Sequence, residues 1–210
     1  ISERNTGVDG YRSYEKLQAA GDLTVRANVT IGYGSPKTAE EAEKFIRDLP
    51  FRFGDGDDWL RVGPLKIFVD GGILYGTAYM REPYGEHANQ FYGFTDPHHR
   101  GTVNFTVDRI ESLMRAAQRN GWQMCSHVTG DAGVDLVLDA LERVNRDKPV
   151  KDWRYTLIHS YFPNETAIRR AAGFGVCVDT QPAWYYKDGD ALAKALGEDR
   201  LKHFIGLADW

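Results

Sequence analysis

Residues 61–70 read RVGPLKIFVD, an almost continuous apolar run that carries one lysine, Lys66, at its centre. Four other runs share this β-rich character: LTVRANVTI (23–31), WQMCSH (122–127), RYTLIHS (154–160) and GVCVDTQP (175–182). Helical patterns separate the runs, and strands that are apolar almost throughout are typical of a parallel sheet covered on both faces. We therefore expect five parallel strands, adjacent in sequence order, near residues 23–31, 62–70, 122–127, 154–159 and 175–180.

The composition is that of a globular domain. The chain has 210 residues, with 26 basic against 30 acidic side chains and a formal net charge of −4. No stretch approaches the ~20 consecutive apolar residues of a membrane span. The net negative charge argues against a nucleic-acid-binding protein, which normally carries a basic surface. We therefore expect one domain over residues 1–210 that binds neither nucleic acid nor membrane.

The first residues, ISERNTG, show neither an initiator Met nor a leader pattern. We expect the chain to be cut from a longer protein at both ends. Cys125 and Cys177 both lie in strand-like runs and are typical of buried thiols, so they do not identify a redox compartment. The cytoplasm is favoured over export, but the compartment stays open.

Two architectures give this alternation of strands and helices: a doubly wound sheet and a (β/α)8 barrel. The polar residues favour the barrel, because Lys66 lies within one strand while His127 and His159 fall at or near the ends of two later ones. In such a barrel, catalytic side chains occupy the carboxyl ends of the strands. Strand alternation also places Lys66 and Asp70 on one face of their strand, so these groups could converge at the barrel mouth.

Structural alternatives exist for each of these residues. A histidine at a strand end is more often a hydrogen-bonded packing residue than a ligand. Lys66 could extend its amine to solvent at the strand edge, or act as a Schiff base, a general base or a modified ligand. Asp70 and Asp131 are candidates for orienting a ligand, although Asp131 also precedes a helical pattern and could cap it.

Three ordered segments resemble the amidohydrolase superfamily, in the branch called amidohydrolase family 3. They are KIFVDGGILYGTAYMREPY (66–84), SHVTGDAGVDLVLDALE (126–142) and YTLIHSYFPNETAIRRAAGFGVCVDTQP (155–182). The resemblance implies an incomplete (β/α)8 barrel of the TIM type and a metal-dependent hydrolase that cleaves an amide-type C–N bond or an ester of a small molecule. It implies that Lys66, as a carbamate, together with His127 and His159, binds one or two divalent ions, zinc being the expected metal. Tyr84, Asp70 and Asp131 would support these ligands or contact substrate.

Two of the chain's departures from the family pattern concern expected metal ligands. No His-x-His pair occurs, and no aspartate stands where the last barrel strand would supply one. The chain thus looks like strands three to seven of eight, and we expect it to bind metal weakly and to lack measurable amidase activity by itself. The alternative is a non-catalytic α/β fragment whose property is partner binding or self-association through exposed sheet edges. A lysine Schiff-base aldolase is disfavoured by the paired histidines.

Overall fold

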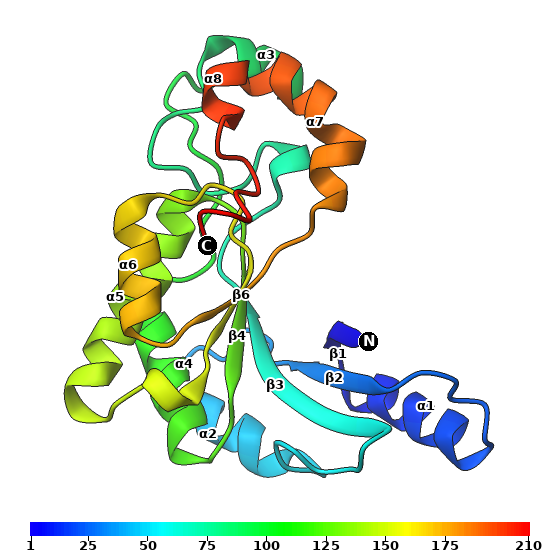
Figure 1. Ribbon diagram of the computed structural model, residues 1–210. Helices are drawn as coiled ribbons and strands as arrows, with labels where there is room; N and C mark the ends of the chain where they lie inside the picture. Colours follow the sequence, from blue (N-terminus) through cyan, green and yellow to red (C-terminus); the bar gives the residue numbers. More distant parts are fainter. The chain divides into compact units, whose positions relative to one another are not determined.

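The computed structural model describes residues 1–210 and contains a six-stranded sheet in which each strand lies beside the next along the chain (Figure 1). The strands are β1 (Ser2–Thr6), β2 (Ala27–Gly32), β3 (Leu60–Phe68), β4 (Met124–Val128), β5 (Thr156–His159) and β6 (Cys177–Asp179). The registers of β1 with β2, β2 with β3 and β5 with β6 are parallel. The predicted parallel α/β architecture, with strands in sequence order as in part of a barrel, is therefore confirmed.

Helices connect the strands, as the sequence predicts. They are α1 (Val8–Ala19), α2 (Ala39–Asp48), α3 (Glu86–Tyr92), α4 (Val107–Arg119), α5 (Asp131–Asp147), α6 (Glu165–Gly173), α7 (Ala183–Leu196) and α8 (Glu198–Leu201), with 3-10 turns at Ile73–Tyr75 and Lys151–Trp153. Local chemistry sets some of their starts: the Asn164 side chain accepts the Ala167 N–H at the first turn of α6. None of the helices has the length and apolar character needed to cross a bilayer.

The structure differs from the sequence expectation in two places. β1 is an additional strand, whose polar sequence SERNT gives no apolar pattern to recognise. Cys177, expected to be a buried thiol, is exposed, whereas Cys125 is buried. The stretch 71–101 contains α3 and a 3-10 turn, and Gly197, with a positive φ of 83°, separates α7 from α8.

The chain divides into two compact units. The first comprises Ile1–Ile67 and Ser112–Cys125, and the second comprises Phe68–Glu111 and Ser126–Trp210. Aromatic pairs help to fill the core of the first unit: Tyr11 packs on Phe51, and Tyr33 on Phe45. Lys66 belongs to this unit, and its backbone carbonyl accepts the Tyr33 N–H.

In the second unit, α3, α7 and α8 gather with the segment that follows β3 (Figure 1). Their contacts enclose a hydrophobic cluster that includes Met80, Tyr84, Leu192 and Phe204. Arg200 stabilises the packing of α8 against the segment after β3, because its guanidinium donates to the carbonyls of residues 82–84 and lies over the Tyr84 ring. The long stretch after β3 is thus a packed part of the second unit.

One buried carboxylate joins the segments around β4. Asp70 follows β3 and is 2 % exposed. Its Oδ1 accepts the Thr129 N–H at 2.8 Å, and its Oδ2 accepts the N–H groups of Gly130 at 2.8 Å and Tyr79 at 3.0 Å. Gly130 is required here, because a Cβ at that position would lie 2.0 Å from the Tyr79 carbonyl oxygen. Asp70 therefore fixes the β4–α5 turn against the chain that leaves β3.

We expect Asp70→Asn to lower the free energy of unfolding by about 2–4 kcal/mol, because an amide offers one acceptor oxygen where the carboxylate offers two. Urea unfolding at pH 8, followed by circular dichroism, measures this loss. Asp190→Asn is the matched control at an exposed position of α7 and should change the stability by less than about 0.5 kcal/mol. Equal stabilities of the two variants would contradict this role of Asp70.

Candidate active site

Two imidazoles lie together at the ends of β4 and β5. His127 is the last residue but one of β4, and His159 is the last residue of β5. Their ring centroids are 4.5 Å apart, with the ring planes at 74°. Both side chains are only partly buried. Of the residues singled out from the sequence, these two and Asp70 are brought together.

Oxygen atoms surround one nitrogen of His127. Its Nε2 lies 3.2 Å from the Gly71 carbonyl oxygen, 3.3 Å from the Thr129 hydroxyl and 3.8 Å from Asp70 Oδ1. A carbonyl oxygen can only accept, so in the neutral ring Nε2 carries the hydrogen and Nδ1 carries the lone pair. The Phe68 ring, 5.1 Å away, flanks the imidazole.

Asp70 has an unusual electrostatic environment beside this imidazole. Burial raises the pKa of its carboxyl to about 7, while the three backbone N–H donors act in the opposite direction. The carboxylate thus takes part in two interactions at once, holding the β4–α5 turn and facing His127. An aspartate so placed can orient the imidazole without itself entering the cavity.

The second imidazole is held by both its backbone and its side-chain partners. His159 has φ 84° and Ser160 has φ 47°, two successive non-glycine residues in the left-handed region. His159 Nδ1 lies 2.6 Å from the Gln181 side-chain oxygen and 3.0 Å from the Tyr161 hydroxyl. Burial raises the pKa of Tyr161, so its hydroxyl remains a neutral donor. Such strained backbone at a strand end is typical of functional sites.

Both imidazoles border a cavity of about 190 Å³. Its lining residues come from the segment after β3, from the ends of β4 and β5, and from α7: Gly72, Ile73, Leu74, Tyr75, His127, Thr129, His159, Tyr161 and Trp184. Most of this lining is apolar. The cavity therefore combines two nitrogen donors with walls suited to an apolar group.

The sequence identified His127 and His159 in this lining. It did not identify Tyr161, which also lines the cavity, or Gln181, which contacts His159. Gln181 lies 22 residues beyond its partner His159. The Q-P dipeptide at the end of the last apolar run was the one signal that could have drawn attention to Gln181.

The remaining candidates lie in other surroundings. Lys66 is buried in β3, at 5 % exposure, within the first unit. Asp131 is the first residue of α5, and its carboxylate accepts the backbone N–H groups of Arg81 and Ala132. Tyr84 donates its hydroxyl to the Ala78 carbonyl inside the hydrophobic cluster, and burial raises its pKa. Neither Asp131 nor Tyr84 lines the cavity beside the histidines.

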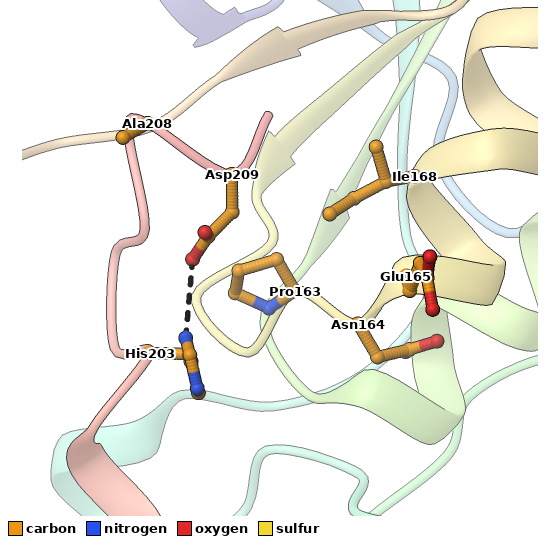
Figure 2. A pocket seen from close by; sticks show the side chains of 7 residues that line it. All are labelled: Pro163, Asn164, Glu165, Ile168, His203, Ala208 and Asp209. Atoms are coloured by element: carbon orange, nitrogen blue, oxygen red, sulfur yellow. Dashed lines mark hydrogen bonds and ion pairs between the residues drawn. The ribbon is translucent and has the colours of Figure 1, made fainter.

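A larger cavity of about 610 Å³ lies at the start of α6 (Figure 2). His203 and Asp209 lie next to each other on one side of it, with Nδ1 and Oδ2 3.3 Å apart, and Glu165 borders it from α6. The His203 side chain is largely exposed. No group of three or more His, Cys, Asp or Glu side chains is placed to hold a metal ion anywhere in the structure. A metal beside His127 and His159 would thus need a ligand of another type.

A comparison of the sequence with known proteins identifies the family of the chain. A model of the amidohydrolase family matches residues 2–210. The Bacillus subtilis protein YtcJ, whose name describes it as an amidohydrolase, is 28% identical over 192 residues, which are 91% of this chain and 32% of YtcJ.

Two solved structures, both described as uncharacterized metal-dependent hydrolases, share the fold. The one from Pyrococcus furiosus has a TM-score of 0.72 and 20% identity, covering 95% of this chain and 37% of that one. The one from Pyrococcus horikoshii has a TM-score of 0.73 and 18% identity, covering 100% and 38%. The chain thus spans about a third of the length of these proteins. With the family model matched over nearly all of its residues, the chain belongs to the amidohydrolase family.

Proposed function

We propose that these residues form the central part of a metal-dependent hydrolase that cleaves an amide-type C–N bond or an ester of a small molecule. The observation that carries the proposal is the pair of imidazoles beside a largely apolar cavity. Family membership supports the same reaction class. The substrate's apolar group would occupy the cavity, with its scissile carbonyl near the two histidines.

The donor atoms fit a divalent ion, and zinc is the ion we propose. His127 and His159 each have one ring nitrogen against an oxygen atom, an arrangement that gives the other nitrogen the lone pair a metal requires. Lys66, as a carbamate, would add an anionic oxygen ligand, and its burial within an apolar strand agrees with a modified side chain. When bound, a divalent ion polarises the carbonyl and lowers the pKa of water toward about 7.

The chain's own residues supply position and shape. Asp70 holds the turn after β4 and faces His127, so it would keep the His127 imidazole in a fixed orientation. Ile73, Leu74 and Trp184 form an apolar wall that would orient the substrate and exclude bulk water. Residues 1–210 would then be one partial barrel domain, with β1 adding a strand before the five foreseen from the sequence.

A second candidate function rests on the sheet order. β1 and β6 stand at the two ends of that order, so each has one neighbour. A parallel sheet with open edges can pair with another chain, and a second copy is the partner we propose. Light scattering after size exclusion tests this property: a monomer at all concentrations would contradict it.

We expect the 210-residue chain to bind zinc weakly, with a dissociation constant of about 10 µM or higher, because the structure supplies two imidazoles where tight sites use three or four ligands. Isothermal titration measures the affinity. His127→Ala and His159→Ala should each weaken it by at least about tenfold. His98→Ala, at an exposed loop position, is the control and should leave it unchanged. Stoichiometric zinc that survives dialysis would contradict the expected weakness.

We expect the complete open reading frame that contains these residues to hydrolyse N-acyl amides or esters only when a divalent metal is present. Lys66→Ala should lower kcat/KM by at least about 10³-fold, which corresponds to the several kcal/mol that a metal contributes. The exposed Lys151→Ala variant is the matched control and should retain activity. Hydrolysis that resists chelators, or equal activity of the two lysine variants, would refute the proposed reaction.

A further inference from the structure

The side chains of Gln181 and Tyr161 both contact the Nδ1 atom of His159 and are hydrogen-bonded to each other. We propose that Gln181 is a positioning residue that holds His159 in the tautomer with the hydrogen on Nδ1, so that Nε2 carries the lone pair. The inference deepens the proposed function and rests on it for its purpose, because a fixed lone pair matters where an imidazole binds a metal. The hydrogen bonds of Gln181 and Tyr161 fix the tautomer.

The orientation of the Gln181 amide follows from its surroundings. Its Nε2 donates to the backbone carbonyl of Asp179 at 2.9 Å and lies 3.4 Å from the Asp179 carboxylate. Both neighbours are oxygen acceptors, so the NH2 group belongs on that side. The amide oxygen must therefore face His159 and Tyr161.

The amide oxygen in turn decides which nitrogen of His159 carries the hydrogen. An amide oxygen can only accept, and His159 Nδ1 lies 2.6 Å from it, so Nδ1 must donate. The Tyr161 hydroxyl also donates to this oxygen, at 2.8 Å. Its single hydrogen is thereby used, so Tyr161 cannot donate to Nδ1 as well. The arrangement is consistent only with Nδ1–H, and in the neutral ring Nε2 then bears the lone pair.

The backbone prevents this arrangement from relaxing. Gln181 stands between the end of β6 and Pro182, the residue that caps α7. The left-handed pair His159 and Ser160 is held by the Ser160 N–H, which donates to the Val128 carbonyl at 2.8 Å. Strain of about 1–3 kcal/mol at each such residue persists only where the surroundings fix it. The backbone thus holds both the His159 imidazole and the Gln181 side chain in position.

The test uses the metal-free 210-residue chain, labelled with ¹⁵N, at pH 8. Long-range ¹H–¹⁵N correlation spectra distinguish a protonated ring nitrogen from one with a lone pair, and His159→Gln identifies the His159 signals. We expect the Nδ1–H tautomer in the wild type. Gln181→Leu, which keeps the approximate volume but removes the acceptor, should give a mixture of tautomers or Nε2–H.

Two further variants separate the acceptor from general packing. Gln181→Glu retains an acceptor oxygen and should keep the hydrogen on Nδ1. Tyr161→Phe removes only the neighbouring hydroxyl and should also keep it. An Nε2–H ring in the wild type would overturn the proposal even if Gln181→Leu failed to fold, and so would an unchanged Nδ1–H ring in a folded Gln181→Leu.

Zinc titration of the same proteins gives the second readout. Gln181→Leu should weaken zinc binding by about 10–100-fold, the usual effect of losing a partner of a metal-binding histidine, whereas Gln181→Glu should not weaken it. An unchanged zinc affinity in Gln181→Leu would contradict the positioning role. The spectra need no metal, so Nδ1–H in a chain that binds no zinc would refute the metal site while supporting the role of Gln181.

Discussion

The carboxylate of Asp70 ties together the second compact unit. It is buried, and it accepts backbone N–H groups from two stretches of chain that are about 50 residues apart, at Tyr79 and at Thr129–Gly130. Without such an acceptor, three buried donors would lack partners, which is among the more costly defects in a protein interior. The turn that follows His127, and with it the start of α5, depends on this one side chain.

The segment after β3 and the helices near the C-terminus depend on each other in a different way. Each supplies one part of an apolar cluster, so the apolar side chains of both are removed from water only when the two segments pack together. Arg200 adds direction to this packing, because a guanidinium that donates to consecutive carbonyls fixes their orientation. As a result, Ile73 and Leu74 meet Trp184 around one cavity, although Trp184 is distant from them in sequence.

The sequence was sufficient to predict five of the six strands, because each lies in a run that is apolar almost throughout. It could not reveal β1, whose residues SERNT are polar and whose pairing with β2 is made by the backbone. The two strand-end histidines were recognisable because position in a parallel sheet predicts where they lie. Gln181 and Tyr161 were missed because their importance comes from contacts across the fold, and Tyr84 and Asp131 proved to be engaged with backbone groups away from the cavity.

The anchoring of the loop after β5 has a dynamic consequence. The carbonyl of Tyr161 accepts the Ile205 N–H, and the carbonyl of Ser160 accepts the indole N–H of Trp210. These hydrogen bonds hold residues 205–210 against the turn that carries His159. Any molecule that binds His159 in this geometry stabilises the turn and, through it, residues 205–210. Because coupling between sites is reciprocal, occupancy beside the imidazole and the hydrogen-exchange protection of the Ile205 amide should rise and fall together.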